Sequence, residues 1–153
     1  MSAYKNFQKD FVERTMYNLK WLKEQKGNKY EHTMLLNQCL GLILLPQQFL
    51  SEEQINRMPQ ELSYYHIELE DIKKIDNDDY SFGSVLRHLR NGIAHGRIAQ
   101  IVEGGDIVGI KVEDRRNSQS PIHTIIHIDA NKLEDIALAI ATAYCETFPN
   151  ANE

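Results

Sequence analysis

The densest group of side chains that could carry out chemistry lies in the segment 86–98, where five of thirteen residues are arginine or histidine. The imidazole of His95 can take up or release a proton near neutral pH. The guanidinium of Arg90 can bind two phosphate oxygens in a forked geometry, and Asn91 can orient either the histidine or the phosphate. These residue types fit the cleavage of RNA by its own 2′-hydroxyl group, which needs a proton carrier and a cation on the phosphate. Such chemistry requires neither a metal ion nor another cofactor.

An ideal helix over this segment has an apolar stripe and an opposite cationic face. The stripe comprises Phe82, Leu86, Leu89 and Ile93, and the cationic face comprises Arg87, His88, Asn91 and His95. Together with Arg97, the residues Arg87 and His88 are candidates for binding the RNA backbone. Arg90 lies on the flank of the helix, about 140° from His95. The two can act together only if the arginine wraps around the helix, the helix breaks at Gly96, or a second copy of the chain supplies the matching residue.

The same segment also has a purely structural interpretation. Cations near the end of a helix gain from its macrodipole, and Gly92 could permit the close approach of a neighbouring helix. Arg90 could pair with a carboxylate in the core. The residue types alone favour this structural interpretation over a catalytic one.

The spacing of Arg90, Asn91, three further residues and His95, with a glycine after the histidine, resembles the Arg-x4-His motif of the HEPN superfamily (higher eukaryote and prokaryote nucleotide-binding domains). Segments 11–15 and 37–46 also resemble plasmid-borne members of that superfamily. The resemblance implies a helical bundle, usually dimeric, that is often a metal-independent endoribonuclease of toxin or defence type with the motif lining a cleft between subunits. It equally allows a catalytically inactive domain that binds a nucleotide or a partner protein, such as a nucleotidyltransferase antitoxin. With the resemblance, a nucleic-acid or nucleotide site becomes the favoured interpretation.

Length and composition suit one globular domain spanning residues 1–153, with 42% hydrophobic residues to form its core. The formal net charge of −5 argues against a protein that coats nucleic acid nonspecifically, but it allows a local basic site. The most apolar run, 34–45, is too short to span a membrane, and no signal peptide is evident. We therefore expect a soluble cytoplasmic protein without membrane contact. The resemblance adds RNA or a nucleotide, and a second copy of the chain, as its expected partners.

The cysteines and histidines show no spacing typical of metal ligands. Cys39 and Cys145 lie in apolar helical contexts, which favours buried thiols over a disulfide or a nucleophile. His123 and His127 fall four residues apart on a predicted strand, about 13 Å from each other, and they fit the solvated face of a small sheet better than a metal site.

The periodicity predicts a mainly α fold, in the form of a HEPN-like antiparallel helical bundle with a small antiparallel β-sheet inserted before the last helix. Helices are expected over about 4–26, 30–45, a short stretch after a capping box at Ser51, 82–95 and 129–148. The insert, about 98–128, contains strands 98–103, 107–112 and 122–128, with a turn at Gly104-Gly105.

Two features leave alternatives open, and a third predicts the oligomeric state. Pro46 should end the second helix, whose polar pair Asn37 and Gln38 must either hydrogen-bond a neighbouring helix or face a subunit contact. The acidic run 68–79 reads as a solvated face or loop, or as a screen for the cationic helix. The divergence of Arg90 and His95 on one helix predicts a homodimer with the motif helices near the twofold axis.

Overall fold

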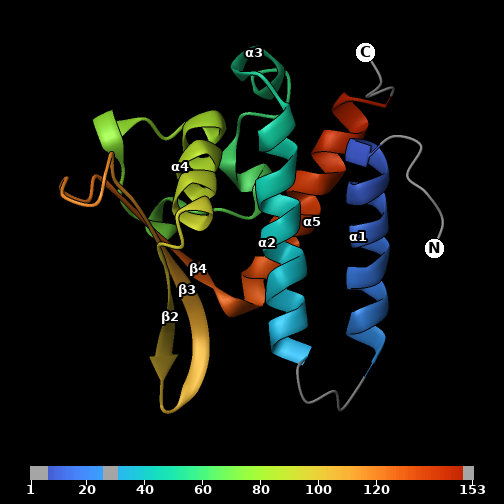
Figure 1. Ribbon diagram of the computed structural model, residues 1–153, viewed down its shortest axis with the longest axis horizontal. Helices are drawn as coiled ribbons and strands as arrows, with labels where there is room; N and C mark the ends of the chain where they lie inside the picture. Colours follow the sequence, from blue (N-terminus) through green and yellow to red (C-terminus); the bar gives the residue numbers. More distant parts are fainter. Residues whose placement is uncertain (1–6, 26–30, 150–153) are drawn as a thin grey trace.

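The computed structural model describes residues 7–25 and 31–149. Its three longest helices lie side by side: α1 (Phe7–Glu24), α2 (Glu31–Phe49) and α5 (Ala130–Thr147) (Figure 1). The short α3 (Glu52–Ile55) follows α2, and α4 (Phe82–Ala94) packs against α2 on the side away from α1. Except at the end of α2, these helices match the predicted ones closely. The outer ends of the predicted first helix, 4–6 and 26, and the first residue of the predicted second helix, 30, lie outside the described residues.

Among the described residues, an antiparallel sheet lies beside the helices (Figure 1). Its strands follow the order β1-β4-β3-β2. Its strands are β1 (Ile72–Lys74), β2 (Ile98–Glu103), β3 (Asp106–Asp114) and β4 (Thr124–Asp129). The hairpin between β2 and β3 turns at Gly104 and Gly105, which have φ angles of 60° and 94°. Glycine reaches these angles without the clash that a Cβ would cause, so the predicted turn is confirmed.

The predicted fold class, a mainly α bundle with a small sheet inserted only before the last helix, is wrong. The strand β1 precedes α4 in the chain and pairs with β4, so the sheet takes strands from both sides of α4. A strand of three residues is too short to show an alternating pattern, and its pairing partner is distant in the sequence. The fold therefore combines the helices with a four-stranded sheet drawn from the middle of the chain.

Helix α4 is covered on two sides. Its apolar stripe faces the other helices, and the ring of Tyr65 stacks on Phe82 with 3.6 Å between the ring centroids. Its second side rests on β3, where Val112 is 1% exposed. Each fully buried side chain of this size contributes on the order of 1.5–3 kcal/mol to folding. The two contacts fix the position of α4 relative to both the helices and the sheet.

Helix α2 departs from its predicted end. The helical backbone continues through Pro46 to Phe49, so the prediction that this proline ends the helix is wrong. A proline near the end of a helix removes a single backbone donor, and the remaining turn is short. Asn37 is exposed, and the side-chain oxygen of Gln38 is buried with no hydrogen-bond partner among the described residues. The expected bond from this pair to a neighbouring helix is therefore not seen there. None of the described helices has the length and hydropathy needed to cross a membrane.

Candidate functional site at the end of helix α4

Helix α4 ends in a turn that places two of the predicted site residues. Gly96 has a φ of 65°, and its N–H donates to the carbonyl of Ile93 at 3.0 Å. The N–H of Arg97 donates to the carbonyl of Gly92 at 2.8 Å, which completes a Schellman motif. His95 is the last residue before this turn and its side chain is exposed. The predicted glycine cap is confirmed, and it directs the chain from α4 into β2.

Gly92 brings α4 into close contact with a strand, whereas the sequence suggested a neighbouring helix. A Cβ at this position would overlap a methyl group of Val112 and lie 2.8 Å from the carbonyl oxygen of Glu113. Only glycine allows the helix backbone to approach β3 so closely. As a result, the polar side chains of α4 lie directly over the carboxyl end of β3.

Asp114, the last residue of β3, receives hydrogen bonds from four directions although its side chain is only 4% exposed. Its Oδ2 accepts from His88 Nδ1 at 2.8 Å and from Asn91 Nδ2 at 3.2 Å. Its Oδ1 accepts from the backbone N–H of Arg115 at 2.8 Å and from Arg97 Nη1 at 3.4 Å. Three of the residues predicted for the site thus meet at one buried carboxylate, which we call the Asp114 network.

Asp114 was missed in the sequence because the predicted strand ended at Val112. The signal was nevertheless present. Ile110 and Val112 point inward in β3, and the same alternation carried two residues further places Asp114 on the inward face. A carboxylate at such a position needs hydrogen-bond donors from another element, and α4 supplies them.

His88 is buried, so its placement on the exposed cationic face was wrong. The sheet covers this side of α4, and an analysis of one helix alone cannot show a second packing partner. Because an ionised carboxylate only accepts hydrogen bonds, Nδ1 of His88 carries the proton in its bond to Asp114. Its Nε2 is buried and has no partner among the described residues. A contact of His88 with RNA stays a prediction, and this burial argues against a direct one.

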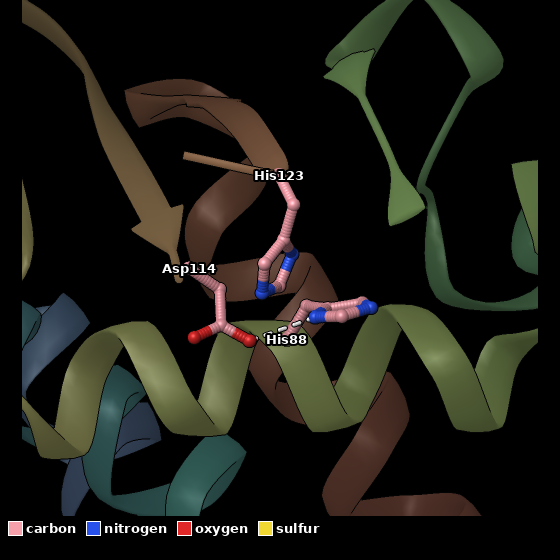
Figure 2. Close-up of side chains that lie close together, drawn as sticks. All are labelled: His88, Asp114 and His123. Atoms are coloured by element: carbon pink, nitrogen blue, oxygen red, sulfur yellow. Dashed lines mark hydrogen bonds and ion pairs between the residues drawn. The ribbon is translucent and has the colours of Figure 1, made fainter. Parts of the chain in front are cut away.

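His123 stands across the ring of His88, with 5.3 Å between the centroids and 65° between the planes (Figure 2). Potential ligand atoms of His88, Asp114 and His123 all lie within 4.8 Å of one another, whereas His127 is not part of the group. Both oxygens of Asp114 already accept hydrogen bonds, one of them from the cationic Arg97. A metal ion bound here would have to displace these donors and lie beside a guanidinium. The chemistry of the group therefore fits a hydrogen-bonded network better than a set of open ligands.

Arg90 points toward the end of α2. Its Nη1 donates to Asn91 Oδ1 at 2.8 Å and its Nη2 donates to Gln48 Oε1 at 3.3 Å. Its Nε is buried with no partner among the described residues. The described hydrogen bonds of Arg90 thus go to neutral amide oxygens and not, as the structural interpretation suggested, to a core carboxylate. The partial negative charge at the end of α2 offsets only part of a full positive charge.

No described contact joins Arg90 to His95 within the chain. His95 lies five residues further along, about 7.5 Å along the helix axis and on another side. The side chain of Arg97 is held by Asp114 and by the carbonyl of Arg115, at 2.7 Å from the latter oxygen. The structure therefore brings Arg90, Asn91 and Arg97 into one connected set with Asp114, and leaves His95 exposed outside it.

A pocket of about 300 Å³ lies beside the first turns of α4, and Arg87 and Arg90 both contribute to its wall. Asp79, the last carboxylate of the acidic run, lines the same pocket. Hydrogen bonds from Ser81 lower the pKa of Asp79, and the nearby charge of Arg87 lowers it further. This end of the run lies close to a cation of α4, as expected if the run screens that helix.

The two cysteines are free, as predicted. Cys39 is fully buried, and this burial, followed by the charge of Glu134, raises the pKa of its thiol to about 12. Cys145 is half-buried, and burial also raises its pKa. Neither environment favours the thiolate that a nucleophile requires.

A family model described as HEPN pEK499 p136 matches residues 1–150, which is nearly the whole chain. No curated protein and no solved structure matches the chain.

Proposed function

We propose that this chain, which belongs to the HEPN pEK499 p136 family, is an endoribonuclease that needs no metal ion. Membership of this family supports a nuclease-like or nucleotide-binding module. In this proposal Arg90 binds the scissile phosphate and Asn91 orients it. His95 transfers the proton, and Arg87 and Arg97 draw the RNA backbone toward the site. A toxin or defence role in the cytoplasm is part of the same proposal.

The observation that carries the proposal is the environment of Arg90. Two amide oxygens hold its guanidinium in place, while its buried Nε–H lacks a partner among the described residues. A cation held by neutral groups retains most of its charge, and a phosphate is the partner that matches its planar fork. Burial strengthens such an interaction because the surrounding medium screens it less than water does.

The proposed reaction uses the RNA as its own nucleophile. The 2′-oxygen attacks the adjacent phosphorus, its proton passes to a base, and the bond to the 5′-oxygen breaks. The products are a 2′,3′-cyclic phosphate and a 5′-hydroxyl, so no water is consumed in this step. An exposed imidazole at His95 can take the proton from the 2′-hydroxyl or give one to the leaving oxygen.

The separation of Arg90 and His95 supports a site shared between two subunits. Within one chain the side chain of Arg90 points to α2, while His95 directly follows the last residue of α4 and lies on another side of the helix. A twofold axis near the ends of two α4 helices would place His95 of the partner subunit opposite Arg90. We therefore propose a homodimer in which each active site combines Arg90 of one subunit with His95 of the partner subunit.

A second candidate function is a catalytically inactive domain that binds a nucleotide or a partner protein, such as a nucleotidyltransferase antitoxin. The observation in its favour is that Asn91 and Arg97 both use hydrogen bonds on the buried Asp114. These two residues then help to hold α4 against β3, and a catalytically inactive member would need the same contacts.

A cleavage assay distinguishes the two functions. Purified protein is incubated with structured and unstructured RNA in EDTA, and His95→Ala is measured beside it. Loss of a general acid or base typically lowers a rate about a hundredfold to ten-thousandfold, so we expect cleavage by the wild type and almost none by the variant. Absence of cleavage by the wild type, or equal cleavage by His95→Ala, would refute the endoribonuclease and leave the binding domain.

A further inference from the structure

We propose that Asp114 is a positioning residue of the candidate site, which orients Asn91 and through it Arg90. This inference rests on the proposed function for its catalytic consequence, but the orientation itself is a property of the folded chain. Asp114 lies on β3, outside the motif and outside the helix that carries it. The effect on Arg90 is therefore transmitted from the sheet to the helix.

The first step is the orientation of the Asn91 amide. A carboxylate oxygen accepts hydrogen bonds and cannot donate them, so the NH2 group of Asn91 must face Asp114, at 3.2 Å. The amide oxygen is then turned to the other side, where it accepts from Arg90 Nη1 at 2.8 Å. Without the carboxylate, either end of the amide could face β3. With its NH2 group toward the arginine, Asn91 would present a donor to a donor.

The second step is the rigidity of the carboxylate itself. Its Oδ1 is held by the N–H of Arg115 at 2.8 Å and by Arg97, which also donates to the carbonyl of Arg115. These contacts come from the end of β3 and from the turn after α4, not from the body of the helix. His88 adds a bond to Oδ2 from the same face of α4 as Asn91, three residues earlier. A carboxylate fixed from three segments can hold the amide in one orientation.

The third step is the effect on the phosphate ligand. The guanidinium of Arg90 is oriented by Asn91 on one side and by Gln48 on the other. Loss of the Asn91 bond leaves a long side chain with one weaker hydrogen bond at 3.3 Å. A bidentate contact with phosphate depends on the plane of the guanidinium. Loss of the Asn91 bond should therefore slow cleavage strongly while it changes the free energy of unfolding only a little.

The kinetic test uses Asp114→Asn, with Asp106→Asn as its matched control because Asp106 is the exposed first residue of the same strand. With RNA in EDTA, we expect kcat/KM of Asp114→Asn to fall about tenfold to a hundredfold and that of the control to stay within about twofold. Asn91→Ala should show a loss at least as large, because Asn91 also orients the phosphate in the proposed function. The double variant should be no worse than Asn91→Ala, because Asp114 acts on Arg90 through Asn91. The inference would be overturned, and the proposed function would stand, if folded Asp114→Asn cleaved RNA at the wild-type rate. It would also be overturned if the two losses in kcat/KM multiplied in the double variant.

A test that does not depend on activity follows the Nε–H resonance of Arg90 by nuclear magnetic resonance, assigned by its absence in Arg90→Lys. We expect the resonance to shift or broaden in Asp114→Asn and in Asn91→Ala, and to stay unchanged in Asp106→Asn. If Asp114→Asn fails to fold, Asp114→Glu takes its place, because its longer side chain keeps a carboxylate but moves the oxygen that accepts from Asn91. An unchanged resonance in the folded Asp114 variant would overturn the inference. This outcome does not depend on whether the wild-type protein cleaves RNA.

Discussion

Replacement of Gly92 by alanine should destabilise the protein, because this glycine sets the distance between α4 and β3. The added Cβ would overlap a methyl of Val112 and lie 2.8 Å from the carbonyl oxygen of Glu113. The strand cannot move away easily, since the N–H of Glu113 donates to the carbonyl of Arg97 at 3.0 Å. Overpacking typically costs about 1–3 kcal/mol, and the helix propensity of alanine returns about 1 kcal/mol. The backbone contact favours the upper part of this range, so we expect a net loss of about 1–2 kcal/mol.

The matched control is Gly83→Ala in the same helix. A Cβ there would lie 3.5 Å from Ile55 Cγ2, which is an ordinary contact. This variant should therefore be neutral or more stable than wild type by up to about 1 kcal/mol. Urea unfolding followed by circular dichroism measures both free energies. If Gly92→Ala proves as stable as Gly83→Ala, α4 is not held against β3 in the way the structure shows, and the basis of the Asp114 network is lost.

Three further predictions test the surroundings of the site. Burial raises the pKa of Cys39 from its ordinary 9.0 to about 12. The buried thiol therefore contributes stability below pH 9 that is lost as the pH rises toward 12. Between pH 9 and 12 the free energy of unfolding should fall less in Cys39→Ala than in the wild type, and an equal fall would contradict the assignment. His88→Ala removes a donor from buried Asp114, and should lower the unfolding free energy by about 1–3 kcal/mol in urea; a loss near zero would mean that the bond does not stabilise the fold. Light scattering at micromolar concentration should give the mass of a dimer, and a strictly monomeric mass would contradict the shared site.

The helices and the hairpin could be read from the sequence because their signals are local. Ser51 and Gln54 form the predicted capping box, and Ser81 caps α4 by accepting a hydrogen bond from the N–H of Ser84. Gly96 ends α4 with a positive φ, as its position after a helical pattern predicts. Each of these features depends on residues within about four positions of one another.

The features that were missed depend on contacts between distant segments. The strand β1 has three residues and exists because β4 offers it a partner. His88 is polar in sequence, and its burial follows from the position of β3 and from the carboxylate of Asp114. A helical wheel describes one helix in water, so it assigns one buried face, whereas α4 has two. For the same reason the sequence pointed to polar residues of α4 but not to the hydrogen bonds that join some of them to Asp114.

In the proposed dimer, Arg90 of one subunit and His95 of the partner subunit form one RNA-cleaving site, and mixing of subunits can show whether they do. Arg90→Ala and His95→Ala are each expected to be nearly inactive alone. In an equimolar mixture that has exchanged subunits, half of the dimers combine the two variants, and one of the two sites in each such dimer is intact. The mixture should therefore recover about a quarter of the wild-type rate. If the mixture is no more active than the separate variants, although mass spectrometry shows that mixed dimers have formed, the shared site is contradicted.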